Sequence, residues 1–287
     1  MTLHLSPERI AIARAAVPLA FRAPLPVRLR RWAFWTLFAG LCAYCFWAFD
    51  VTPARLWTGL GRLGKVLSFM FPPHVWTSWA DFAPILKGLG ETLSMAFLGT
   101  VLGAAVAFPL SFLGARNINR LTFLRLGVRR GYDIIRAFET LILALIFIRA
   151  FGLGPLAGIL AIAVSEVGTF AKLFSEAIEN NSERPIEGVK AAGGSRLQQI
   201  RYGLLPQVNP VILSILLYNF ESNVRSGTIL GIVGAGGIGF LLSDRISAYR
   251  WDEAWSIIFL IIVMVYLIDW LSGGIRRRFI GTWEGTK

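Results

Sequence analysis

Six apolar runs, separated by charged segments, make up most of this 287-residue chain. They cover residues 32–49, 91–114, 132–151, 153–174, 210–234 and 254–272. Each is about 20 residues long, the length of helix that crosses the hydrocarbon core of a bilayer. Because backbone polar groups in lipid must be satisfied within the segment, these runs predict helices. The expected fold is an all-α polytopic membrane protein with six transmembrane helices.

Composition supports a membrane protein. Hydrophobic residues make up 55% of the chain and charged residues 16%, and the mean hydropathy is +0.60. A soluble domain could not bury that much apolar surface. The net charge of +12 would suggest nucleic acid in a soluble protein. Here the basic residues gather between the apolar runs, as in cytoplasmic loops, so no nucleic-acid partner is expected.

The arginines also predict an orientation. Residues 115–131 carry five arginines and no acidic residue, which is typical of a loop on the cytoplasmic side. With this loop inside, the tails 1–31 and 276–287 are also cytoplasmic. Residues 32–49 then form the first span, 50–89 form a periplasmic, interfacial segment, and 90–275 hold five further helices. The first apolar run is interpreted as a span rather than a cleavable signal peptide.

Several short motifs are interpreted as structural. The sequence GLGRLGK at residues 59–65 resembles a phosphate-binding loop, but Val66 stands where Ser or Thr would hold magnesium. Cys42 and Cys45 lie inside the first apolar run, where small packing residues are expected. His4 and His74 are far apart and join no zinc or hydrolase motif. We therefore expect no enzyme activity, metal site or cofactor in this chain.

A glycine-rich stretch ends the fifth run. Its sequence, GAGGIG, has the form GxGxxG, but no βαβ unit surrounds it and no acidic residue follows at the required distance, so dinucleotide binding is not expected. The glycines are expected to allow close packing or a bend. Alternatively, a broken helix exposes backbone amides that meet an anion or form a gate. The candidate gate or helix-break residues are Gly234, Gly236, Gly237 and Gly239.

Charged residues within the runs are candidates for a substrate path. Each costs about 2.5–3.5 kcal/mol at a helix centre and should face water or a partner. In one interpretation they neutralise each other on one helix face, Arg136 with Glu139 and Glu221 with Arg225. In the other they line the substrate path, where an arginine can bind an oxyanion through two hydrogen bonds. Asp269 is expected to pair with the arginines that follow it. The candidate path residues are Arg136, Glu139, Glu166, Glu221, Asn223, Arg225 and Ser226.

The polar loop 175–208 lies between the fourth and fifth runs. Its centre, EGVKAAGGSRLQQIRYGLLP, resembles the EAA loop of ABC importer permeases in Glu187, in Gly193 and in the final Leu-Pro. Gly188 and Val189 replace the paired alanines of that family, and Gly203 replaces the usual isoleucine. The resemblance implies a short coupling helix that docks in a cleft of an ATPase subunit. The residues it assigns to coupling are Glu187, Gly188, Ala191, Gly193, Ser195, Leu205 and Pro206.

Other stretches resemble phosphonate permeases. They are residues 70–73 (MFPP), 91–117, 136–147 (RAFETLILALIF) and 220–242. This resemblance implies the type I ABC importer permease fold, in a homodimer with two ATP-binding subunits that use ATP and magnesium. A periplasmic substrate-binding protein and a bacterial inner membrane are implied with it. The implied function is import of phosphonate, phosphate or phosphite by alternating access.

Two other functions remain open. The nearer is an ABC permease for methionine or another amino acid, whose glycine-rich fifth span would look similar. The more distant is a stand-alone secondary transporter or channel. It would need no ATPase, so the loop around Glu187 would be dispensable.

Overall fold

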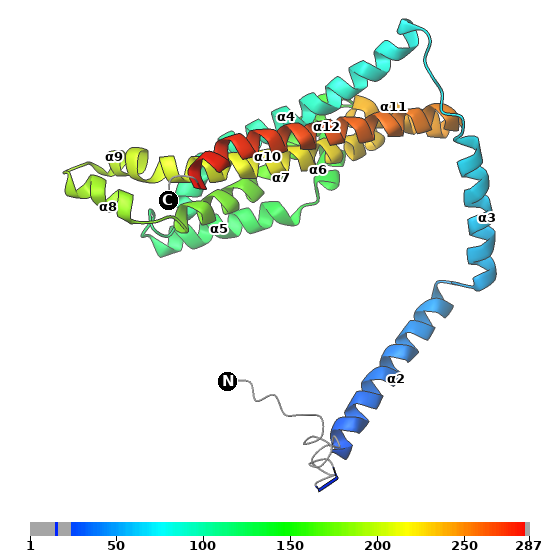
Figure 1. The fold of residues 1–287 in the computed structure, drawn as a ribbon, viewed down its shortest axis with the longest axis horizontal. Helices are drawn as coiled ribbons and strands as arrows, with labels where there is room; N and C mark the ends of the chain where they lie inside the picture. Colours follow the sequence, from blue (N-terminus) through cyan, green and yellow to red (C-terminus); the bar gives the residue numbers. More distant parts are fainter. Residues whose placement is uncertain (1–14, 17–23, 285–287) are drawn as a thin grey trace. The chain divides into compact units, whose positions relative to one another are not determined.

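The structure is a computed structural model that describes residues 15–16 and 24–284, and every described element is a helix (Figure 1). The elements are α2 (Leu25–Ala48), α3 (Pro53–Phe69), α4 (Trp79–Gly114), α5 (Thr122–Ala137), α6 (Thr140–Phe151), α7 (Pro155–Glu179), α8 (Arg184–Ala191), α9 (Arg196–Gln198), the π-helical η1 (Gln199–Leu204), α10 (Leu205–Leu230), the π-helical η2 (Gly231–Ala235), α11 (Gly237–Ser247) and α12 (Trp251–Glu284). The all-α prediction is confirmed. Most of the predicted tail 1–31 lies outside the described residues.

Four described stretches are long and apolar enough to cross a bilayer: α4, α7, the continuous stretch Arg196–Ala235, and Trp251–Arg278. Helices α2 and α3 pass the same test only together, and they meet at a bend of 56°. Helix α6 is apolar but has only 12 residues. The six predicted spans correspond to α2, α4, α5 with α6, α7, α10 and α12, and the third is broken.

The chain divides into two compact units, residues 1–68 and 69–287. In the first unit, α2 and α3 contain no buried residue. Helix α2 begins at Leu25, seven residues before the predicted start at Trp32, because Pro26 is tolerated in a first turn. The hydrophobic core clusters of the described residues belong to the second unit.

Helices α4 and α7 form the most extensive helix–helix contact among the described residues, and their backbones approach closely. A Cβ added at Gly99 would lie 2.6 Å from Cβ of Ile162, and one added at Gly103 would lie 2.7 Å from Cβ of Glu166. The GxxxG spacing thus permits the close helix contact that the sequence predicts. Phe170 of α7 and Val208 of α10 belong to one buried cluster, so α10 joins this pair.

The prediction of one helix over residues 132–151 is wrong. Helix α5 ends at Ala137, Phe138 and Glu139 are extended, and α6 starts at Thr140. The break lets both halves contact α7: a Cβ on Gly168 would lie 2.9 Å from Cγ of Arg136, and the Thr140 hydroxyl donates to Ser165 Oγ at 3.0 Å. Arg136 and Glu139 therefore do not share one helix face.

Other helices extend beyond the predicted runs. Helix α4 starts at Trp79, within the predicted segment 50–89, where Ser78 Oγ accepts from the Ala80 N–H at 3.3 Å and Asp81 favours the N-terminus. Helices α7 and α12 continue to Glu179 and Glu284, past residues 175 and 276. Helix α5 starts at Thr122, inside the predicted loop 115–131. Arginine, lysine and glutamate have good helix propensity, so polar side chains did not stop these helices.

Candidate functional site

A buried polar cluster joins α4, α7 and α10 near the middle of the bundle. Asn223 Nδ2 donates to Glu166 Oε1 at 2.9 Å and to Thr100 Oγ1 at 3.1 Å. All three side chains are buried, Glu166 with 8% of its surface exposed. Its second oxygen, Oε2, is buried and has no hydrogen-bond partner among the described residues. Two candidate path residues therefore meet here, together with Thr100, which the sequence analysis missed.

A second charged cluster lies on α10 and α12. Arg225 Nη1 bonds Glu221 Oε1 at 3.1 Å, so this predicted pair is present. The Glu221 side chain is 11% exposed and that of Arg225 52% exposed. Arg276 lies 4.0 Å from carboxylate oxygens of both Glu221 and Asp269, which agrees with the predicted pairing of Asp269. The Arg225 guanidinium is thus accessible, and the buried carboxylate of Glu221 balances its charge.

Three other candidates lie apart from these clusters. Arg136 and Glu139 flank the break between α5 and α6, and both are exposed. Ser226 is half-buried on α10, next to Arg225. The structure therefore does not bring all seven candidates into one site.

The glycine-rich stretch breaks the helix after α10. Gly234, Gly236 and Gly237 have φ values of 109°, 81° and 72°, a region that glycine adopts without strain. Close contacts exclude a side chain as well: a Cβ on Gly239 would clash with the Thr228 carbonyl oxygen, and one on Gly236 would lie 3.1 Å from Cδ of Pro155. Bending and close packing occur together here.

The first two backbone N–H groups of α11, after the break, donate hydrogen bonds to side chains of α4. The Gly237 N–H donates to Glu91 Oε2 at 3.1 Å, and the Ile238 N–H donates to Thr92 Oγ1 at 2.9 Å. These two groups therefore start α11 as caps supplied from 146 residues away. The idea that the broken helix leaves free amides for an anion is wrong for these two N–H groups. The sequence analysis missed this role of Glu91 and Thr92 because caps are normally sought next to the helix.

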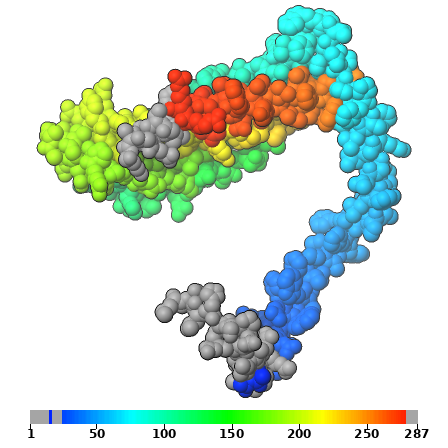
Figure 2. Space-filling view, viewed as in Figure 1, coloured from blue at the N-terminus to red at the C-terminus, as the bar shows by residue number. Residues whose placement is uncertain are grey.

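The loop around Glu187 folds into short helices at one end of the second unit (Figures 1 and 2). Helix α8 has no buried residue, and Glu187, Gly188 and Ala191 are exposed on it. It ends at Ala191, Gly193 follows with a φ of 81°, and Ser195 forms a capping box with Gln198 that starts α9. Leu205 and Pro206 open α10, so the loop continues directly into that helix.

A cleft of about 240 Å³ lies beside α8. It is lined by Glu187 and Lys190 of α8, by Arg196, and by Asn117 and Arg120 of the segment after α4. Gly203 lets η1 approach α8, since a Cβ there would lie 2.8 Å from Cα of Ile186. The glycine that replaces the isoleucine of the resembling family therefore has a packing reason.

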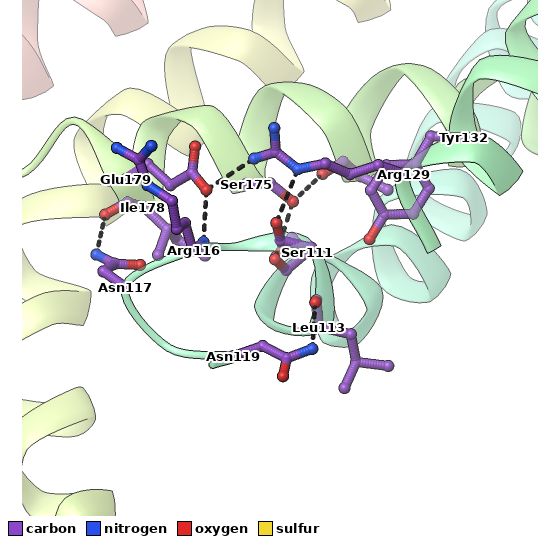
Figure 3. Close-up of polar contacts among 12 residues, drawn as sticks. Ser111, Leu113, Arg116, Asn117, Asn119, Arg129, Tyr132, Ser175, Ile178 and Glu179 are labelled. Atoms are coloured by element: carbon purple, nitrogen blue, oxygen red, sulfur yellow. Dashed lines mark hydrogen bonds and ion pairs between the residues drawn. The ribbon is translucent and has the colours of Figure 1, made fainter. Parts of the chain in front are cut away.

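Glu179, the last residue of α7, joins the segment after α4 to the middle of α5 (Figure 3). Its Oε1 accepts from the backbone N–H of Arg116 at 2.5 Å and from Arg129 Nη2 at 2.7 Å. Asn117 Nδ2 donates to the Ile178 carbonyl at 2.8 Å, and Arg129 Nε donates to the Gly114 carbonyl at 2.9 Å. This contact set holds the segment 115–121 next to the start of the loop that forms α8.

Among the residues that the structure describes, no group of three or more His, Cys, Asp or Glu side chains could hold a metal ion.

Sequence comparison identifies the family. Residues 99–281 match the family described as the binding-protein-dependent transport system inner membrane component. A protein of Stutzerimonas stutzeri with the provisional name phosphite transport system permease protein HtxC is 38% identical over 257 residues, 89% of each chain. The phosphate-import permease protein PhnE of Mycolicibacterium smegmatis is 35% identical over 271 residues, 94% of this chain and 50% of that protein.

Structure comparison supports the same fold. The MetNI methionine ABC transporter in an inward-facing conformation has a chain that superposes with a TM-score of 0.62 and 23% identity. The match covers 71% of this chain and 99% of that chain, which shows a shared type I ABC importer permease fold. The family is a membrane permease rather than an enzyme. This chain belongs to the binding-protein-dependent transport system inner membrane component family, the permease subunits of ABC importers.

Proposed function

We propose that this permease moves phosphorus oxyanions, namely phosphonate, phosphate or phosphite, into the cytoplasm by alternating access. The proposal rests on sequence identity to two permeases. The permease whose name refers to phosphite is 38% identical over 89% of the chain, and the permease whose name refers to phosphate is 35% identical over 94% of the chain. The methionine transporter, at 23% identity, supports a common fold only. Methionine is therefore the weaker alternative.

Arg225 is the side chain that we assign to the anion. Its guanidinium is half-exposed, and Glu221 holds it on the side that faces the bundle. A planar guanidinium offers two parallel N–H donors to two oxygens of an oxyanion. Asn223 lies two residues away on the same helix but on another face, where it bonds Glu166 and Thr100 in the buried cluster, so Arg225 is the residue of α10 that stays accessible to an anion.

We assign coupling to residues 187–206, with exposed α8 as the surface that docks on an ATP-binding subunit. Because this loop continues into α10, a displacement of α8 would be passed along that helix to Asn223 and Arg225. The complete importer would contain a second copy of this chain, two ATP-binding subunits that use ATP and magnesium, and a periplasmic binding protein. It would lie in the inner membrane, with both termini of this chain in the cytoplasm.

In the transport cycle, ATP would draw the two ATPase subunits together and bring the two α8 helices closer. The permeases would then open outward and receive the anion from the binding protein. Hydrolysis and release of product would return them to the inward-open state. The glycine break at residues 234–239 is assigned as the gate, since it is the point where the α10 helix bends.

The test is ATPase activity of the purified complex in liposomes with its binding protein. Phosphonate, phosphite, phosphate and methionine are added separately to wild type, Glu187→Ala and Arg225→Ala. Arg149→Ala, which removes an exposed arginine of α6 outside the assigned path, is the control. We expect stimulation by one or more phosphorus oxyanions in wild type and in the control, and its loss in the other two variants.

The other outcomes separate the alternatives. Stimulation by methionine alone would overturn the substrate assignment and leave the fold unaffected. Uptake into liposomes by the permease without any ATPase would indicate a secondary transporter or channel. Full stimulation of Glu187→Ala would refute the coupling role of the loop.

A further inference from the structure

The break between α5 and α6 leaves two opposite charges exposed. Arg136 is in the last turn of α5, and Glu139 is the residue before α6. They are three positions apart, but the chain leaves the helical conformation at Phe138 and Glu139, and no ion pair joins them in the described structure. The only nearby pair of similar spacing is Arg130 with Asp133, at 3.5 Å within α5.

Both charges lie at the middle depth of the bundle. Arg136 packs over Gly168, and Thr140, next to Glu139, bonds Ser165. Ser165 and Gly168 are central in α7, which spans Pro155–Glu179 and is long and apolar enough to cross the membrane. A charge at this depth is costly in lipid and requires a partner or water.

The described chain offers neither charge a partner. Two acidic residues of α5 and α7 are already engaged: Glu166 with Asn223, and Asp133 with Arg130 and Lys172. Both side chains are exposed, so a group from outside the chain can reach them.

We propose that the partner is a second copy of this chain, in which each Arg136 pairs with Glu139 of the partner subunit. A two-fold axis makes the same patch contact itself, so one patch with a cation and an anion forms two identical pairs. The break between α5 and α6 leaves the two charges available for pairing between subunits, because in a continuous helix they would neutralise each other within one chain. The inference rests on the proposed function, in which two permeases form one pathway.

The test uses charge reversal in differently tagged copies that are expressed together. Arg136→Glu and Glu139→Arg should each lower dimer assembly when expressed alone, on the order of a hundredfold in association constant, because like charges would face each other in a low-dielectric interface. When the two variants are mixed, both contacts of the mixed dimer again join opposite charges. Dimer formation, measured by capture of one tag and detection of the other, should return.

Two controls separate pairing between chains from pairing within one. The double variant Arg136→Glu/Glu139→Arg should assemble and have the thermal stability of wild type, which shows that the reversed residues are compatible with folding. Arg130→Glu mixed with Asp133→Arg should show no gain from mixing, because that pair lies within one helix.

A second measurement does not depend on charge reversal. Copies with Arg136→Cys and Glu139→Cys, in a background with Cys42→Ala and Cys45→Ala, should cross-link between differently tagged chains with a bismaleimide reagent, whose spacer covers the length of the two side chains it replaces. Failure to cross-link, no gain from mixing while the double variant assembles, or unchanged assembly of the single variants would each overturn the proposal. The proposal would also be overturned if the single variants still formed dimers but needed more phosphate for half-maximal stimulation of ATPase activity. That result would mean that the two charges face the substrate path. Assembly is measured without substrate or ATPase, so a wrong substrate assignment would leave this result unaffected.

Discussion

At the scale of single residues, one amide holds the centre of the bundle together. Asn223 of α10 donates both of its amide hydrogen bonds, to Glu166 of α7 and Thr100 of α4. A buried polar group that loses its partner loses more than an average hydrogen bond, because it cannot turn to water. This contact is therefore a point where a change on α10 is transmitted to the α4–α7 pair.

Removal of this amide should destabilise the second unit. In Asn223→Ala, the carboxylate of Glu166 loses its donor, and we expect a loss of about 1–3 kcal/mol in unfolding free energy. Thermal unfolding of the detergent-solubilised protein measures it. The matched control is Asn219→Ala, one helical turn earlier, whose amide only bonds the Ile215 carbonyl of its own helix. Equal stability of the two variants would contradict the role assigned to Asn223.

The packing of α4 against α7 depends on a missing side chain. In Gly103→Ala the new Cβ would lie 2.7 Å from Cβ of Glu166, so one helix must shift, at a cost of about 1–3 kcal/mol. Gly90→Ala, on the same helix with nothing within 4 Å of the added atom, is the control and should be neutral or stabilising. The melting temperatures of the two variants test this prediction. An unchanged melting temperature of Gly103→Ala would mean that α4 and α7 can move apart without loss of stability.

At the scale of elements, the short connections place the assigned coupling surface. The segment 115–121 is bound to α7 by Glu179 and Asn117, and to α9 by Arg196, whose Nη2 donates to the Ile118 carbonyl at 2.8 Å. Helix α8 follows Glu179 by only a few residues. An exposed helix with no buried residue thus has a defined position through polar contacts of its neighbours.

Loss of the Glu179 carboxylate should loosen this region without unfolding the bundle. In Glu179→Ala, the Arg116 amide and the Arg129 guanidinium lose their shared acceptor. We expect faster amide hydrogen exchange in residues 115–121, with little change in the core of α4 and α7. Glu176→Ala, an acidic residue of the same helix one turn earlier, is the control. Equal exchange in both variants would contradict the assigned role of Glu179.

At the scale of the whole molecule, the two units differ in how they are built. The second holds the core clusters and the whole of the family match, residues 99–281. The first contains α2, whose large side chains are exposed, including Trp35 and Trp47. Side chains of this kind suit lipid rather than a protein core.

Cleavage between α2 and α3 should therefore leave the second unit intact. A specific protease site inserted at residues 51–52 would release α2 from the membrane-inserted, folded protein. We expect the melting temperature of the second unit and the ATP-driven transport to stay unchanged, because α2 buries no residue. A clear fall in melting temperature after cleavage would show that α2 contributes to the fold of the second unit.

Local composition was enough to predict the helices, their close packing and the family. Hydropathy determines which runs become helices, because a chain in lipid must satisfy its backbone within each segment. The glycine spacing at Gly99 and Gly103 indicates close packing, and the motif from Glu187 to Pro206 indicates the family. The i,i+4 pair of Glu221 and Arg225 is visible for the same reason, since one helix places both side chains together.

Which distant groups meet depends on the packing of the helices, and local composition does not predict it. Asn223 lies 57 residues from Glu166 and 123 from Thr100, and Glu91 caps a helix 146 residues away. The break after Ala137 was also invisible in the sequence, because apolar residues follow it and only contacts with Gly168 and Ser165 favour it. Hydropathy describes how each segment meets the bilayer, whereas the position of a buried polar group depends on how the helices pack against one another.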